Sequence, residues 1–395
     1  MNPFRILCAA GLLAIFSSTA SKSPVLPLFA LHLGADPSGV GLIAAVSAFT
    51  GVIFSIPAGI LSDRYGKRRM IVASACIFAA APFLYLVTST LWQLALVRFL
   101  HGFATAIFVP VAMAMVSDLF HRERGERLGW FSTSTLAGRF IAPLAGGVLI
   151  TAFAGAAASG FHAVYLVCGA AGTAALLLIL RLPRSGQPSG HAGQKWAQTW
   201  TGARRILSDK GITLAAAAEA AILFAYGTFE TFLPLAALAA GRTPAETGLF
   251  LSAQVITLAI TKPLLGRFSD RHGRLSQIFF GALFGGACIS AFAFSSSFFP
   301  MLGSSILFGL SLSVVTSATS ARIADLSSCE TRGSAMGVLG SVMDIGHTAG
   351  PIVAGILAAR FGFGTAFITA AVVLLSVAVC FRVFSGEQEK ICTMG

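Results

Sequence analysis

Two stretches of this sequence, GILSDRYGKRR at Gly59–Arg69 and GRFSDRHGR at Gly266–Arg274, repeat one charged pattern. Each places a glycine, three residues, the pair Asp-Arg, one residue, a second glycine and a basic residue in the same order. The first glycines are residues 59 and 266, an offset of 207 positions. Because both stretches interrupt sequence that is otherwise apolar, the pattern indicates a chain built from two related halves.

The composition of the chain predicts a membrane protein. Of its 395 residues 56% are hydrophobic and only 11% are charged, whereas soluble domains average about 25% charged residues. Runs of about 20 apolar residues mark membrane-spanning helices, and the absence of period-2 alternation argues against a β-barrel. The expected spans lie at roughly 6–32, 39–61, 70–89, 91–117, 128–154, 162–181, 211–238, 244–265, 275–295, 299–320, 334–357 and 363–382. The expected fold is therefore an all-α integral membrane protein with twelve transmembrane helices in two pseudo-symmetric six-helix bundles.

The net charge of +12 follows the topology of these spans. Most Lys and Arg residues lie at the termini and in the even-numbered connections, whereas Arg242 and Arg360 lie in odd-numbered ones. The positive-inside rule then predicts that both termini and the even-numbered connections are cytoplasmic. The basic character is explained without a nucleic-acid partner, and its secondary effect is attraction to anionic lipid headgroups.

The repeat extends over most of each half. The same offset of 207 relates three further pairs: Pro27 and Pro234, Gly102 and Gly309, and Asp118 and Asp325. We therefore expect an N-terminal bundle at 1–181 and a C-terminal bundle at 211–384. Residues 182–210 form a polar cytoplasmic linker with a short surface helix near Trp196–Ile206, and residues 385–395 form a cytoplasmic tail.

Motifs for enzymatic or cofactor chemistry are not found in the sequence. The seven cysteines are scattered without a CxxC pair, and no metal-ligand cluster or nucleotide-binding phrase stands out. We expect no enzyme, no metal and no cofactor, so a gradient must supply the energy for any transport.

Six plus six helices, a linker and a repeated loop resemble the major facilitator superfamily, most closely its drug/proton antiporter branch. The loop signature of the family is matched between helices 2 and 3 by Gly59, Leu61, Asp63, Arg64, Gly66, Lys67 and Arg68, and between helices 8 and 9 by Gly266, Asp270, Arg271, Gly273 and Arg274. The resemblance implies that this loop holds the two halves together on the cytoplasmic side in the outward-open state. A role in topology alone is the alternative.

The residue types of the loop have their own physical reasons. The first glycine of each copy permits close approach of a neighbouring helix. The aspartate can face the positive end of an adjoining helix. The basic residues can pair with acids such as Glu123, Glu126 or Glu330.

Three further phrases resemble family motifs. In helix 5, GRFIAPLAGG resembles the exporter signature but has Ala142 in place of its second glycine, and GHTAGPIVAG repeats it in helix 11. The residues concerned are Gly138, Pro143, Gly146, Gly147, Gly346, Gly350 and Pro351. Ordinary small-residue packing is the alternative for each glycine alone. In helix 4 the resemblance implies that Arg98 lies near the proton-handling site, with His101 at a position where the family usually has glutamine.

Ionisable residues inside spans are costly, about 2.5–3.5 kcal/mol each on insertion scales, so each needs a reason. Glu219, Tyr226 and Glu230 lie within about 20° of one line on helix 7 and share a face. Lys22 of helix 1 has the duplicate position 229, next to Glu230. Because helices 1 and 7 line the central cavity in the family, we expect Lys22 and Glu230 to face one another for substrate or proton coupling. A static ion pair between these helices is the alternative.

Other ionisable residues inside the spans are secondary candidates. They are Arg139, its duplicate His347, and Asp344 one turn before His347 on the same face. Lys262, near the end of helix 8, is expected to extend its ammonium group to the membrane surface.

The function expected from these observations is secondary active transport by alternating access, as proton-coupled export of a small amphipathic molecule. The alternatives are a proton symporter importing a polar nutrient, organic acid or metal chelate, and a membrane scaffold or receptor without transport. The expected partners are a small-molecule substrate, protons and membrane lipids, the chain acting as a monomer in a bacterial cytoplasmic membrane.

Overall fold

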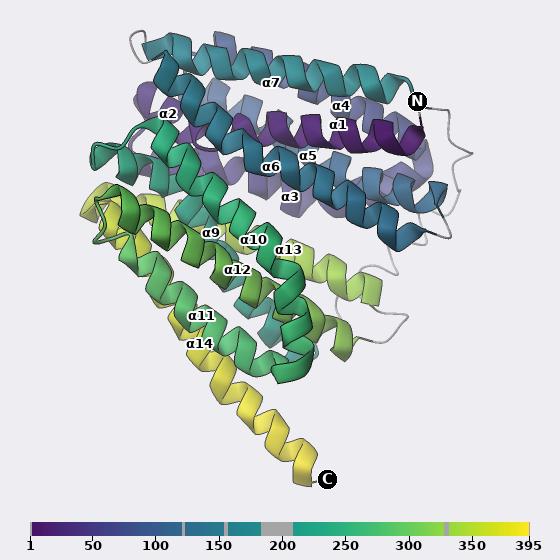
Figure 1. Cartoon of the computed structure of the whole chain (residues 1–395), viewed down its shortest axis with the longest axis vertical. Coiled ribbons are helices and arrows are strands. Elements are labelled where there is room, and N and C mark those ends of the chain that lie inside the picture. Colours follow the sequence, from purple (N-terminus) through teal and green to yellow (C-terminus); the bar gives the residue numbers. More distant parts are fainter. Residues whose placement is uncertain (1, 121–122, 154–156, 183–207, 328–331, 395) are drawn as a thin grey trace. The chain divides into compact units, whose positions relative to one another are not determined.

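The computed structural model describes residues 2–120, 123–153, 157–182, 208–327 and 332–394, which contain helices and no strand (Figure 1). The helices are α1 (Pro3–Ala20), α2 (Val25–His32), α3 (Pro37–Tyr65), α4 (Lys67–Leu84), the 3-10 helix η1 (Tyr85–Val87), α5 (Leu91–Leu119), α6 (Arg124–Ala152), α7 (Ala157–Leu180), α9 (Lys210–Ala239), α10 (Pro244–His272), α11 (Arg274–Ala291), α12 (Phe298–Leu326), α13 (Arg332–Phe361) and α14 (Phe363–Met394). Among the described residues, 12 helical segments are long and apolar enough to cross a membrane. The predicted fold class is confirmed. The surface helix expected near Trp196–Ile206 lies outside the described residues.

The first span consists of two helices. Helix α1 ends at Ala20 and α2 begins at Val25, with Lys22 in the connection between them. Pro24 explains the break, because proline lacks the N–H that a helix interior requires and disfavours helical backbone in the residue before it. A broken spanning helix exposes backbone groups within the membrane, as in the substrate sites of many transporters.

The second glycine of each repeated loop has a conformational reason. Gly66 between α3 and α4 has φ of +93°, and Gly273 between α10 and α11 has φ of +87°. Residues with side chains rarely adopt this region, so glycine lets two long helices join through a single residue. This requirement accounts for the second glycine in both copies of the repeat.

The start of α3 is fixed by a side-chain cap. Asp36 accepts hydrogen bonds from Ser38 Oγ at 2.6 Å and from the Gly39 amide at 2.9 Å. These hydrogen bonds, with that from Ser38 the larger contribution, lower the pKa of the Asp36 carboxyl. The cap satisfies one of the free amides at the helix start and keeps this carboxylate outside the span.

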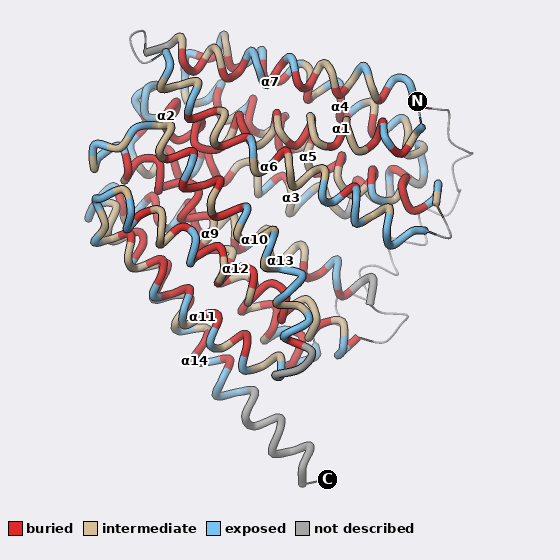
Figure 2. The backbone as a smooth tube through the Cα atoms, viewed as in Figure 1, coloured by how far each residue is buried: buried red, intermediate tan, exposed pale blue. Residues whose placement is uncertain are grey.

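The chain divides into two compact units. Unit 1 comprises residues 1–196 and 237–252, and unit 2 comprises residues 197–236 and 253–395. In unit 1, α1 packs against α6 and α7, and α5 packs against α3 and α4. In unit 2, α11 packs against α12 and α14. Figure 2 shows buried positions concentrated along helices such as α1 and α12, whereas outward faces are exposed.

Large apolar side chains remain exposed at the helix ends. Trp92, at the start of α5, is 86% exposed, and Phe299, at the start of α12, is 80% exposed. These two positions are related by the offset of 207. Exposed aromatic residues at span ends are typical of a membrane–water interface.

Candidate functional site

The repeated loops form matching ion pairs, one in each unit. In unit 1 Lys67 contacts Asp118 at the end of α5. In unit 2 Arg274 Nε lies 2.9 Å from Asp325 Oδ2 at the end of α12. The offset of 207 relates both members of one pair to those of the other. Each unit therefore ties its loop to the end of a helix from the next helical hairpin.

Two of the three acids named as possible partners of these loops are described by the structure. Glu123 pairs with Arg127 one turn along α6, and Glu126 is exposed in the first turn of that helix. Glu330 lies outside the described residues. Asp118 reaches Lys67 because α5 continues to Leu119 and carries the aspartate to the loop.

The other basic residues of the first loop have different contacts. Arg68 donates from Nε to Leu182 O at 3.0 Å and from Nη2 to Leu180 O at 3.1 Å. It thus satisfies carbonyl groups at the end of α7, where the helix dipole also stabilises a positive charge. Arg64 is exposed and lies over the ring of Tyr65.

Part of the loop motif is untested, and one expectation is corrected. Helical backbone is described at Gly59, Asp63, Asp270 and Arg271, but their side-chain surroundings lie outside the described part of the structure. A Cβ built at Gly266 would meet nothing within 4 Å. The close helix approach expected there is not observed.

Glycines of the helix 5 and 11 phrases, in contrast, mark close backbone contacts. A Cβ at Gly138 would lie 2.4 Å from Leu12 O of α1, and one at Gly346 would lie 2.2 Å from Ala220 O of α9. Gly350 meets Phe224 O at 2.2 Å in the same way. Any side chain at these positions would push two helices apart. The duplicated phrase therefore holds corresponding helix pairs together in both units.

The remaining glycines of the helix 5 phrase differ in their contacts. A Cβ at Gly146 would meet Val25 Cγ2 at 3.1 Å, and one at Gly147 would meet Pro244 O at 2.2 Å. Gly147 therefore admits the start of α10, which belongs to unit 1.

Pro143 lies within α6, and a serine bridges the helix beside it. Ser252 Oγ donates to Phe140 O at 2.8 Å and accepts from the Leu144 amide at 3.2 Å. In an uninterrupted α-helix these two backbone groups would bond to each other. A hydroxyl inserted into the ladder is a known cause of local bending.

Three of the predicted residues of unit 2 come together. Glu230 of α9 is 7% exposed, and its Oε2 lies 3.1 Å from His347 Nε2 of α13. The ring of Tyr226, one turn earlier on α9, lies 5.3 Å from the His347 ring. Gly227 allows this contact, because a Cβ there would be 2.7 Å from His347 O. The result is a carboxyl–imidazole pair within the membrane-spanning part of the unit.

Glu219 forms a separate cluster. It is fully buried, and its Oε2 is hydrogen-bonded to Thr319 Oγ1 of α12, while Oε1 has no hydrogen-bond partner among the described residues. Because α9 rises about 1.5 Å per residue, Glu219 and Glu230 lie about 16 Å apart along the helix. They share a face, as predicted, but have different surroundings.

The remaining candidates lie at other positions of the two units. Lys22 lies in the break of the first span and belongs to unit 1, whereas Glu230 belongs to unit 2, so their pairing stays a prediction. Arg139 is exposed on α6, and Asp344 is partly buried on α13. Arg98 is buried, with Nη1 3.3 Å from Tyr85 Oη.

Sequence reasoning missed several residues with structural contacts. Thr319 and Ser252 are ordinary hydroxyl residues in apolar spans, and nothing in the sequence distinguishes them from others. Tyr85 and Tyr165 carried a weak signal, since the chain has only four tyrosines.

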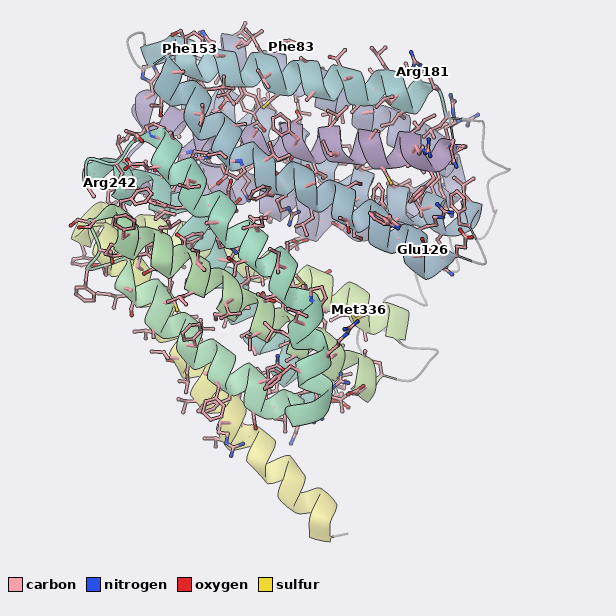
Figure 3. The ribbon with its side chains drawn as sticks, viewed as in Figure 1. Phe83, Glu126, Phe153, Arg181, Arg242 and Met336 are labelled. Carbon is pink, nitrogen blue, oxygen red and sulfur yellow. The ribbon has the colours of Figure 1, made fainter. Side chains whose placement is uncertain are left out.

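Labelled residues mark the two ends of unit 1. Figure 3 shows Arg181 and Glu126 at the end of unit 1 where the N-terminus lies, and Phe153 and Arg242 at the other end. Lys67 begins α4 and Asp118 lies near the end of α5. By the order of the helices, both lie at the same end of unit 1 as Glu126. The fold and these sites together define a polytopic α-helical membrane protein with a duplicated six-span plan.

The chain belongs to the Major Facilitator Superfamily, whose family model matches residues 7–241 and 218–390. It is 24% identical to multidrug resistance protein MdtG of Citrobacter koseri, covering 96% of this chain and 95% of that one. It is 26% identical to multidrug resistance protein 1 of Bacillus subtilis, covering 85% and 84%. The resemblance to the drug-efflux branch is thereby supported.

Solved structures agree on the fold. A bacterial homologue of the human lysosomal transporter Spinster superposes with a TM-score of 0.81 at 16% identity, covering 97% of both chains. The nucleoside transporter NupG superposes with a TM-score of 0.76 at 15% identity, covering 97% of this chain and 99% of that one. The family indicates that this protein is a membrane transporter.

Proposed function

We propose that this protein exports small amphipathic molecules across a bacterial cytoplasmic membrane in exchange for protons, by alternating access and as a monomer. The drug-resistance names of its relatives support export. The absence of a nucleotide-binding phrase in the sequence supports an ion gradient as the energy source. Both termini are proposed to be cytoplasmic, because the basic residues favour that side.

The observation that carries the proposal is the buried pair of Glu230 and His347. Both groups exchange protons, and their heavy atoms lie 3.1 Å apart in a spanning region where ionisable residues are rare. A proton held by the pair reduces its charge and favours burial, whereas release leaves a carboxylate that prefers water or a cation. Binding and release of a proton therefore bias the pair between enclosed and water-accessible surroundings.

The repeated loops supply the second element of the mechanism. The ion pairs Lys67–Asp118 and Arg274–Asp325 attach each loop to its own unit. A loop held in one position can act as a rigid latch during alternating access. We assign them a gating role on this basis.

Purified protein in proteoliposomes tests proton coupling directly. With a fluorescent amphipathic cation inside, a pH gradient should drive its movement against the direction of proton flow. Glu230→Gln should abolish this gradient-driven transport while retaining substrate exchange without a gradient. Glu126→Gln, at an exposed position on α6, is the matched control and should behave as wild type.

Each outcome separates one reading from another. Movement of the substrate with the protons would favour the symport alternative. If the rate of substrate transport by the wild-type protein is the same with and without a pH gradient, proton coupling is overturned. Gradient-driven transport unchanged in Glu230→Gln would remove Glu230 from the mechanism while leaving antiport intact.

A further inference from the structure

We propose that unit 1 holds a binding site for a small monovalent anion, such as chloride, formed around Arg98 with Tyr85 and Tyr165. The site is separate from the Glu230–His347 pair, which belongs to unit 2. It rests on a buried charge that unit 1 itself does not neutralise.

Arg98 is enclosed by the helices of unit 1. Its side chain on α5 is 1% exposed, and Tyr85 of η1 and Tyr165 of α7 are each 0% exposed. Nη1 of Arg98 donates to Tyr85 Oη at 3.3 Å, but Nε has no hydrogen-bond partner among the described residues. A guanidinium stays protonated in proteins, and an uncompensated buried ion costs several kcal/mol. This position therefore favours an anionic partner.

Acidic residues of unit 1 lie at helix ends, away from Arg98. They are Asp36, Asp63, Asp118, Glu123, Glu126 and Glu246. Asp36 caps α3, and Glu246 accepts a hydrogen bond from the Thr243 amide at the start of α10. Both carboxylates therefore lie at the start of a helix.

The other four acids belong to the opposite end of α5. Asp118 lies 20 positions after Arg98 on this helix, which is about 30 Å along its axis. It pairs with Lys67, and Asp63 is in the last turn of α3, four residues before Lys67. Glu123 and Glu126 follow the end of α5. Unit 1 thus provides no carboxylate at the depth of Arg98.

The groups around Arg98 are suited to hold an anion. Tyr85 Oη accepts from Arg98, so its own proton remains available to donate. Tyr165 Oη has no partner among the described residues, and its ring is stacked on Tyr85 at 4.4 Å. The guanidinium N–H and the two phenol O–H groups are all hydrogen-bond donors, which is what an anion requires of its site. Because all three side chains are enclosed, a monatomic anion fits this site better than an organic one.

His101 links anion binding to a proton. Ser21 Oγ donates to Ser18 O at 2.9 Å, so at its 3.4 Å contact with Ser21 the histidine Nδ1 is the donor. In the neutral ring Nε2 then carries a lone pair, and it has no partner among the described residues. A lone pair repels an anion, whereas a protonated Nε2 attracts one. Anion binding should therefore bring a proton to His101.

The described residues of this cluster come from four elements of unit 1. Arg98 and His101 come from α5, Tyr85 from η1, Tyr165 and Cys168 from α7, and Ser21 from the end of α1. Arg98 is the permanent charge among them, and it is positive. A bound anion would offset the repulsion between Arg98 and a protonated His101, so that the anion and the proton stabilise each other.

Thermal unfolding of the detergent-purified full chain tests the site. Sodium chloride is compared with sodium gluconate at equal ionic strength, at about pH 6 and about pH 8. Chloride should raise the unfolding midpoint in a saturable way, because a ligand that binds the folded form stabilises it, and the rise should be larger at the lower pH. Bromide, located by anomalous scattering in crystals, should bind beside Arg98.

Matched variants assign the effect to this arginine. Arg98→Gln should lose the chloride-dependent shift, and Arg98→Lys, which keeps the charge, should bind chloride with lower affinity. Arg181→Gln, outside the cluster at the end of α7, should respond as wild type. A wild-type midpoint equal in chloride and gluconate overturns the proposal, as does an undiminished chloride shift in a folded Arg98 variant. An equal shift at both pH values overturns the role of His101.

Discussion

Arg274 and Asp325 of unit 2 form an ion pair, with Nε and Oδ2 2.9 Å apart, that reproduces the pair Lys67–Asp118 of unit 1. The side chains of Arg274 and Asp325 are 21% and 51% exposed. Pairs of this exposure contribute about 0–1 kcal/mol to stability. Because the stabilising effect of this duplicated contact is so small, its role is better explained as positioning the loop than as stabilising the fold.

Asp325→Asn should therefore affect transport more than stability. We expect an unfolding midpoint close to wild type and a reduced transport rate in proteoliposomes. Exchanging the charges, as Arg274→Asp with Asp325→Arg, should restore part of the rate. Glu123→Gln, which breaks a local pair within α6, is the control. Full transport activity in Asp325→Asn would contradict a gating role for this pair.

The duplicated glycines give a prediction about stability. In Gly346→Ala the new methyl group would lie 2.2 Å from Ala220 O, which is backbone and cannot move aside cheaply. Overpacking of this kind costs about 1–3 kcal/mol or more. Gly337→Ala on the same helix meets nothing within 4 Å and should be neutral or slightly stabilising. Unfolding midpoints in detergent measure both, and equal midpoints would show that α9 and α13 are not held closely at Gly346.

The fold was predictable because its signals are repeated and strong. Apolar runs of span length, basic connections and an offset of 207 each depend on local sequence alone. The close contacts of Gly138 and Gly346 were predictable for the same reason, since a glycine in a repeated phrase marks a position without room for a side chain. The break at Pro24 was not predicted, because an apolar run conceals a change of backbone direction.

The site was only partly predictable. Helical periodicity placed Glu219 and Glu230 on one face, which is a property of α9 alone. Their partners Thr319 and His347 come from other helices, and periodicity does not say which helix faces which. The pairing of Glu230 with His347 therefore had to come from the structure. Asp118 was not predicted as the partner of Lys67, because the sequence does not say which of the acids after this helix lies beside the loop.

The cluster at Glu219 predicts a measurable coupling energy. Thr319→Val removes the hydroxyl that is hydrogen-bonded to Glu219 Oε2 and leaves the carboxyl group without this partner. An unsatisfied buried polar group costs about 1–3 kcal/mol. Glu219→Leu combined with Thr319→Val should recover much of this loss, as measured by thermal unfolding. Thr369→Val, which removes a bond only to its own helix, is the control, and additive losses in the double variant would argue against coupling.

Ser252 should stabilise α6 from the neighbouring helix. In Ser252→Ala both Phe140 O and the Leu144 amide lose their hydroxyl partner beside Pro143. We expect a loss of about 1–3 kcal/mol, since neither group has access to water within the span. Ser290→Ala removes an exposed hydroxyl that bonds within α11 and should have little effect. If the two variants unfold at the same temperature, α6 closes its own ladder without Ser252.

Membrane topology gives the last prediction. Arg69 in α4 and Ser276 in α11 are related by the offset of 207, and both follow the repeated loops. In a background without native cysteines, Arg69→Cys and Ser276→Cys should react with a membrane-impermeant maleimide only after the cells are permeabilised. Ser89→Cys, in the connection before α5, should react on intact cells. Since each half has six spans, the two copies of the loop must lie on the same side of the membrane. Labelling of Arg69→Cys and Ser276→Cys from opposite sides would contradict the duplicated plan itself.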